Sequence, residues 1–270
     1  MAQQLVDIGL NLTNKRFHKD REEVLIRAQR AGVSRCILTG TSLEGSEQAV
    51  ALCNSLSHQF PKMLTATAGV HPHEAATVDD ETMSTLETLI KENRGTVVAV
   101  GETGLDFNRN FSPPDRQISS FERHLDLATR LELPLFLHER DAHSTQIEIL
   151  HHWRGKVSGV IHCFTSDITA LTNYLDMGFY IGITGWVCDE RRGLELQTLV
   201  KTIPLNRLLV ETDAPYLLPR TLRPKPKDNR NEPAFLPEVV AEISRQSIYS
   251  LEEIAQASTA NAKSLFRLAD

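Results

Sequence analysis

The chain has 270 residues, of which 41% are hydrophobic and 24% are charged, and its formal net charge is −6. This length can bury a sizeable core, and the composition is that of a globular protein rather than a disordered or fibrous one. The acidic balance argues against indiscriminate binding of nucleic acid, so a polyanionic substrate would need a local basic patch. The sequence shows no signal peptide, no long apolar run and no CxxC pair among its four cysteines. We therefore expect a cytoplasmic protein with reduced thiols and no membrane contact.

Short apolar segments alternate with longer amphipathic ones along the chain. The expected strands cover residues 5–8, 35–38, 63–69, 97–101, 134–138, 159–162, 179–182 and 207–211. Helical periodicity lies between them, for example over 46–56, 80–91, 114–131 and 191–201, and closes the chain over 236–247 and 251–268. This alternation predicts a parallel α/β sheet, and eight repeats indicate a (β/α)8 TIM barrel that forms one domain over 1–270. A doubly wound sheet is the alternative, but neither GxGxxG after the first strand nor a Walker A sequence supports it.

Residues 214–235, APYLLPRTLRPKPKDNRNEPAF, interrupt the alternation. Their prolines and polar residues predict a long loop, and long loops inside a domain are often functional. Its part from 220 to 230 holds five basic residues and one acid. Because the loop follows the last strand, we expect Arg220 to lie over the same barrel face as Arg140 and Arg191, where all three would bind a phosphodiester substrate. The alternative is a solvated charged loop with no such role.

Side chains that can bind a divalent metal stand where several expected strands end. Glu102 ends the fourth, His138 ends the fifth and His162 ends the sixth, while Asp213 follows the eighth. In a parallel barrel these ends open onto one face, so the side chains should converge. Nitrogen and oxygen donors suit Mg²⁺, Mn²⁺ or Zn²⁺, and a bound ion activates water for hydrolysis.

Two of these carboxylates are the expected catalytic residues. Glu102 would act through the metal, and Asp213 is either a further ligand or the general base that accepts a proton from water. Asn11 follows the first expected strand and His71 follows the third, so both should face the same substrate.

Taken together, the ordered motifs resemble the TatD family of metal-dependent deoxyribonucleases. The matching stretches are GVHPH (69–73), GETGLDF (101–107), FLHERDAH (136–143), IHCF (161–164), YIGITGWVCDERRG (180–193), ETDAPYLLP (211–219) and NEPA (231–234). The opening DIGLNLT and the GWVCDERRG stretch are most similar to the bacterial members. The resemblance implies a distorted, amidohydrolase-like barrel and a 3′-to-5′ exonuclease of single-stranded DNA and RNA that uses Mg²⁺ in DNA repair or nucleic-acid turnover. It also implies that Glu102, His138 and His162 bind the metal and that Asp213 is the family's TDAP aspartate.

The first strand departs from the family pattern. Most relatives carry an HxH pair there, whereas this chain has Gly9 and Asn11 at those positions. Glycine has no side chain to ligate, and an asparagine carbonyl oxygen suits Mg²⁺ better than Zn²⁺. We expect one metal held by the protein, and a second ion only with substrate phosphate.

Two other functions remain open from the sequence. An amidohydrolase acting on a small ester, amide or phosphoester would share the barrel, although such enzymes usually rely on the HxH pair. A non-catalytic binding protein on a decayed barrel is the third possibility, and the intact acidic and histidine set argues against it. The sequence specifies no oligomeric state, so a monomer is the default expectation.

Overall fold

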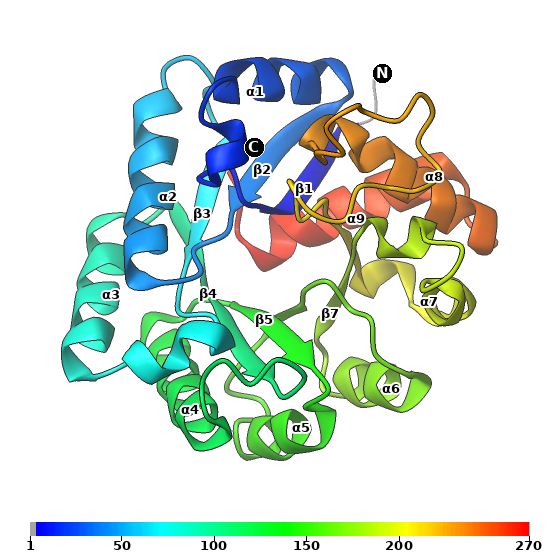
Figure 1. The fold of residues 1–270 in the computed structure, drawn as a ribbon. Coiled ribbons are helices and arrows are strands. Elements are labelled where there is room, and N and C mark those ends of the chain that lie inside the picture. Colours follow the sequence, from blue (N-terminus) through cyan, green and yellow to red (C-terminus); the bar gives the residue numbers. More distant parts are fainter. Residues whose placement is uncertain (1–3, 270) are drawn as a thin grey trace.

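A computed structural model describes residues 4–269 and contains an eight-stranded sheet in the order β1 to β8, with every neighbouring pair parallel. Figure 1 shows the strands arranged in a ring with the helices around it. The predicted (β/α)8 barrel is therefore confirmed. Its strands are β1 (Leu5–Leu10), β2 (Val33–Leu38), β3 (Leu64–Ala68), β4 (Val97–Asp106), β5 (Leu135–Arg140), β6 (Gly159–Ile161), β7 (Tyr180–Ile183) and β8 (Leu208–Val210).

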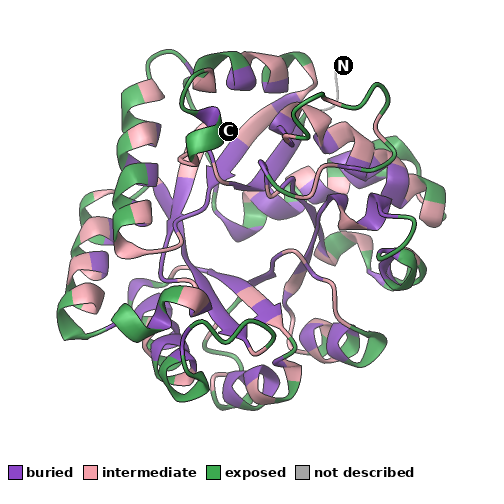
Figure 2. Cartoon of the chain, viewed as in Figure 1, coloured by how far each residue is buried: buried purple, intermediate pink, exposed green. Residues whose placement is uncertain are grey.

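The helices cover the outside of the barrel, and Figure 2 shows their buried faces turned toward the strands. In α4, for example, the buried residues Phe121, Leu125 and Ala128 recur at helical spacing, which places an apolar stripe against the sheet. The helices are α1 (Arg21–Arg30), α2 (Leu43–Leu56), α3 (Asp80–Glu92), α4 (Pro114–Leu131), α5 (His143–His152), α6 (Ile168–Asp176), α7 (Leu194–Leu199), α8 (Leu236–Gln246) and α9 (Leu251–Leu265). None of the helices within residues 4–269 is long and apolar enough to cross a membrane.

Two of the expected boundaries are wrong in ways that affect the site. The fourth strand does not end at 101 but continues to Asp106, so Glu102 lies within the strand. The seventh helix does not begin at 191. It begins at Leu194, because the Asp189 carboxylate accepts hydrogen bonds from the amides of Arg191 and Arg192 and holds them in a turn. The loop expected over 214–235 is found over 214–232, which form turns and irregular backbone apart from a bridge at Ala214, whereas Pro233–Phe235 form a short 3-10 helix.

The barrel closes between its first and last strands through a short contact. The Asp213 amide donates to the Gly9 carbonyl at 2.8 Å, and the Asn11 amide donates to the Ala214 carbonyl at 2.9 Å. An isolated bridge between Leu10 and Ala214, just beyond β8, accompanies these hydrogen bonds. This closure places the side chains that follow β1 and β8 next to each other at the C-terminal end of the barrel.

The floor of that end is apolar. Val6, Ile8, Val98 and Phe136 belong to a buried cluster that also contains residues from the end of α9. The Phe136 ring stacks on the His162 ring at 4.7 Å between centroids. This apolar packing restrains His162 and excludes water from the side of the barrel interior.

Candidate active site

A cavity of about 520 Å³ opens at the C-terminal ends of the strands. It brings together seven residues that the sequence singled out: Asn11, His71, Glu102, His138, Arg140, His162 and Asp213. Threonines and asparagines from the loops after β1 and β2 complete much of the wall, together with Trp186 and Tyr216. Catalytic groups in TIM barrels stand at this end of the strands, and the cavity is therefore the candidate active site.

The Glu102 carboxylate lies at the centre of three imidazole rings. Its Oε1 atom is 3.0 Å from His138 Nδ1, 3.0 Å from His162 Nε2 and 3.3 Å from His71 Nε2. Burial alone would raise the pKa of Glu102, but the surrounding histidines hold it well below its usual range. Conversely, Glu102 and Glu211 outweigh burial and raise the pKa of His162 well above its usual value. The centre thus concentrates one buried carboxylate and several nitrogen donors at the base of the cavity.

These groups fit a divalent metal. Donor atoms of His71, Glu102 and His138 all lie within 4.8 Å of one another. Ligand atoms about 2.0–2.2 Å from one ion are about 3.0–3.5 Å apart, which matches the separations around Glu102. His138 Nε2 is also buried, and it lies 3.4 Å from Asp106 Oδ2. His71, which the sequence placed against the substrate, thus joins this cluster, and His162 stands beside it.

Glu211 is a site residue that the sequence analysis missed. It is fully buried, its Oε2 atom lies 3.1 Å from His162 Nδ1, and its Oε1 atom accepts a 2.5 Å hydrogen bond from the Cys163 amide. A methyl group at Gly9 would overlap Glu211 Oε2, and one at Gly182 would lie 2.6 Å from Oε1. The signal in the sequence is the pairing of an acid at the end of the last strand with glycines in the strands on either side of it.

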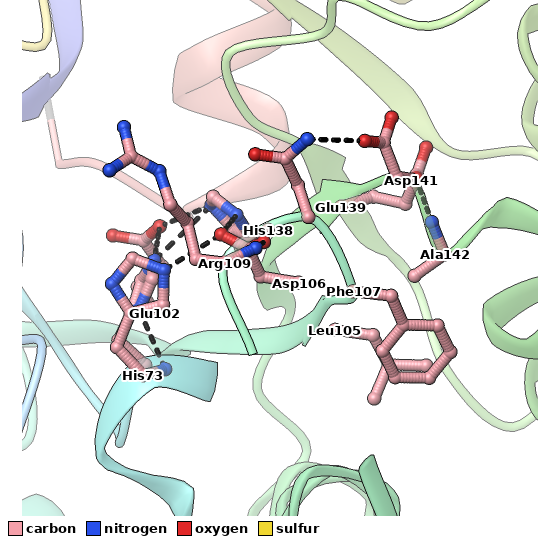
Figure 3. Close-up of polar contacts among 12 residues, drawn as sticks. His73, Glu102, Leu105, Asp106, Phe107, Arg109, His138, Glu139, Asp141 and Ala142 are labelled. Carbon is pink, nitrogen blue, oxygen red and sulfur yellow. Dashed lines mark hydrogen bonds and ion pairs between the residues drawn. The ribbon is translucent and has the colours of Figure 1, made fainter. Parts of the chain in front are cut away.

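Asp106 is the second missed residue, and Figure 3 shows the His138 ring close to both Asp106 and Glu102. Asp106 Oδ2 lies 2.7 Å from His73 Nε2 and 3.4 Å from His138 Nε2. Although burial opposes it, hydrogen bonding with His138, His73 and the Arg109 amide lowers the pKa of Asp106 below its usual value. The even spacing of Glu102 and Asp106 on one strand could have revealed it, had the strand been extended to 106.

Asp213 differs from Glu102 and Asp106 in the direction of its pKa shift. Asn11 Nδ2 donates to Asp213 Oδ1 at 2.9 Å. Burial, reinforced by the charges of Glu102 and Glu211, raises the pKa of Asp213 to about 7 although His162 opposes the shift. Asp213 can therefore gain or lose a proton near neutral pH. Its φ of +53° is a left-handed conformation that aspartate tolerates and that often marks functional positions.

The family model described as TatD related DNase matches residues 6–267 of this chain. The chain belongs to this family. Among curated relatives, the protein named 3′-5′ ssDNA/RNA exonuclease TatD of Pectobacterium atrosepticum is 48% identical over 266 residues, which cover 98% of this chain and 100% of the relative. The protein of the same name from Edwardsiella piscicida is 47% identical with the same coverage.

Solved structures agree with this assignment to the TatD-related family. A TatD homologue from Escherichia coli superposes with a TM-score of 0.88 at 27% identity, and a TatD family hydrolase from Entamoeba histolytica with 0.89 at 29%, each covering 100% of both chains. An organophosphorus hydrolase from Deinococcus radiodurans reaches a TM-score of 0.65 at 14% identity, covering 98% of this chain and 93% of its own. This last likeness concerns the barrel fold alone.

The arginines around the site of this TatD-related chain differ in which cavity they line and which acids they contact. Arg140 lines the cavity, and its guanidinium carbon lies 5.6 Å from the centroid of the Trp186 ring. Arg220 instead lines a smaller adjacent cavity and forms hydrogen bonds of 3.0 Å with each Glu190 carboxylate oxygen. Arg191 is in neither set of described lining residues, and Arg230 points away, to Asp20 and Glu232.

Proposed function

We propose that this chain is a metal-dependent nuclease that releases nucleotides from the 3′ end of single-stranded DNA and RNA. The observation that carries the proposal is the convergence of His71, His138 and His162 on Glu102 inside a cavity of the family barrel. Curated relatives that match almost the whole chain carry the name of such an exonuclease, which supports this activity over hydrolysis of a small ester or amide.

The metal would be held by Glu102 and its surrounding histidines, with Asp213 as a further ligand or as the base. A divalent ion bound there would lower the pKa of a water molecule and polarise the phosphoryl group. Mg²⁺ is the proposed ion, with Mn²⁺ or Zn²⁺ as alternatives, because Gly9 offers no donor and Asn11 offers only an amide. A second ion would need ligands from the substrate.

The remaining residues bind and orient the substrate. Asp213, with its pKa near 7, accepts the proton of the attacking water, and Asn11 holds its carboxylate in place. Arg140 lies in the cavity wall and can pair with a phosphate oxygen. Asp106 and Glu211 touch His138 and His162 on the sides away from Glu102, so they fix the orientation of these rings.

The test follows a single-stranded oligonucleotide labelled at its 3′ end in one sample and at its 5′ end in another, with and without Mg²⁺. We expect the 3′ label to leave first as a mononucleotide, while the 5′-labelled strand shortens stepwise. Glu102→Gln keeps the size of the side chain but removes the charged ligand, so it should lower the rate more than about 100-fold.

Glu47→Gln is the matched control, since Glu47 is an exposed residue of α2 outside the cavity. Its rate should equal that of the unmodified protein. An intact oligonucleotide after long incubation with Mg²⁺, Mn²⁺ and Zn²⁺, or full activity in Glu102→Gln, would contradict the proposed function.

A further inference from the structure

A second cavity of about 220 Å³ adjoins the active-site cavity and shares Trp186 and Leu217 with it. Three cationic side chains and one acid line this second cavity: Arg192, Arg220, Lys225 and Asp189. The excess of positive charge next to a proposed phosphodiester site is unexpected in a chain whose net charge is −6. A polyanion that extends beyond the first cavity would therefore enter a favourable potential here.

The two arginines of this second cavity are held in place before any ligand binds. Asp189, which is buried, accepts hydrogen bonds from Arg192 Nε at 2.9 Å and from the Arg192 amide at 3.2 Å. The Arg192 guanidinium carbon lies 4.5 Å from the centroid of the Trp186 ring, and Trp186 Nε1 donates to the Arg192 carbonyl at 3.2 Å. Arg220 is paired with the exposed Glu190, an interaction weak enough for a phosphate to compete with.

Trp186 lines both cavities. Arg140 lies over its ring from the active-site cavity, and Arg192 lies over the same ring while lining the second one. Each cation–π contact restrains one guanidinium group, so the indole ring sets the separation between two phosphate-binding arginines. Grooves that follow a single strand combine this type of basic lining with aromatic side chains.

We propose that the second cavity binds the phosphate group adjacent to the scissile one, on its 5′ side, through Arg192, Arg220 and Lys225. This proposal rests on the proposed function. A 3′-terminal nucleotide has no phosphate beyond the one that is cut, so the neighbouring phosphate of the strand always lies toward the 5′ end. The enzyme would thereby bind a strand with two consecutive phosphates more tightly than a lone phosphodiester.

Two substrates that differ by one group test this assignment. A dinucleoside monophosphate carries only the scissile phosphate, whereas the same dinucleotide with a 5′-phosphate also carries the adjacent one, with the same bases. We expect the 5′-phosphate to lower KM about tenfold, which is the effect of one charge-assisted contact.

Lys225 and Lys227 provide a matched pair of variants, because both are exposed lysines of the same loop and only Lys225 is among the residues that line the second cavity. Lys225→Gln should remove most of the KM difference between the two substrates, and Lys227→Gln should retain it. Equal KM values for the two substrates, or equal behaviour of the two variants, would overturn the second phosphate site while leaving the nuclease proposal intact. If neither dinucleotide nor longer strands are hydrolysed, the proposed function fails and this inference fails with it.

Discussion

The Glu211 carboxylate occupies space that β1 and β7 leave open by placing Gly9 and Gly182 against it. From there it binds His162 Nδ1, so the other nitrogen of that ring faces Glu102. A carboxylate behind a ligating histidine fixes the tautomer and orientation of the ring. Gly9 is therefore more than the loss of a family histidine, because its missing side chain makes room for the group that orients His162.

This arrangement predicts that Gly9→Ala destabilises the fold and reduces activity. The added methyl group would overlap Glu211 Oε2 and displace it from His162. Overpacking of this kind costs about 1–3 kcal/mol, which the midpoint of urea unfolding would measure. The cost should be smaller in a Glu211→Ala background, because the overlapping carboxylate is gone. An equal cost in both backgrounds would contradict the role assigned to Glu211.

At the scale of elements, α4 connects the strands that carry Glu102 and His138, two of the proposed metal ligands. Its Gln117 side chain accepts from the Asp106 amide at 2.8 Å and donates to the Asp106 carbonyl at 3.1 Å. Its His124 side chain accepts from the Val70 amide through Nε2 at 3.1 Å, next to His71. One helix thus fixes the C-terminal ends of both β3 and β4. It does so through buried polar side chains that interrupt its otherwise apolar stripe.

His124 gives stability a specific dependence on pH. Burial lowers its pKa from 6.5 to about 4, so the unfolded chain binds a proton between these values and the folded chain does not. The free energy of unfolding should therefore keep its full His124 contribution above pH 6.5 and fall by about 3 kcal/mol as the pH decreases to 4. His124→Gln keeps an acceptor for the Val70 amide without titrating, so urea titrations from pH 7 to 4 should show a shallower decline. The same decline in both proteins would refute this assignment.

The sequence predicted those elements whose pattern lies in neighbouring residues, and it missed features that depend on contacts between distant ones. Apolar periodicity located the eight strands, and helix α4 was predicted at the residues where it is found, because its stripe of large side chains is unambiguous. The extension of β4 to Asp106 was missed because Glu102, Thr103 and Asp106 are polar, and polar residues ordinarily end a strand. Glu211 was missed because its role depends on glycines in other strands, a relation visible only once the barrel is assembled.

At the scale of the whole molecule, the loop after β8 is anchored to the opposite end of the sequence. Arg230 binds Asp20 at 2.7 Å and Glu232 at 2.6 Å, and Arg27 binds the same two acids. Arg16 donates to the carbonyls of Pro215, before the basic stretch 220–230, and of Asp228, within it. The loop that carries Arg220 and Lys225, two of the three cations of the second cavity, is therefore held against the region around α1.

Replacing Arg230 by glutamine should release this loop. Hydrogen bonds to charged groups contribute about 1.5–3 kcal/mol, so local opening should become at least about tenfold more frequent. Trypsin should then cut faster after Arg220 and Lys227, as mass spectrometry of the fragments would show. Arg94→Gln, an exposed change before the start of β4, is the control and should leave the rate unchanged. Equal cleavage of all three proteins would contradict the anchoring role.

The closure between β1 and β8 has a consequence for synthesis of the protein. Asn11 meets Asp213 across 202 positions of sequence, and the segment directly after β8 supplies both Glu211 and Asp213. A nascent chain that has already emerged with His71, Glu102, His138 and His162 still lacks Asp213, the proposed general base, and Glu211, which contacts His162. The RNA-cutting activity that we propose therefore cannot begin beside the ribosome until translation is nearly finished.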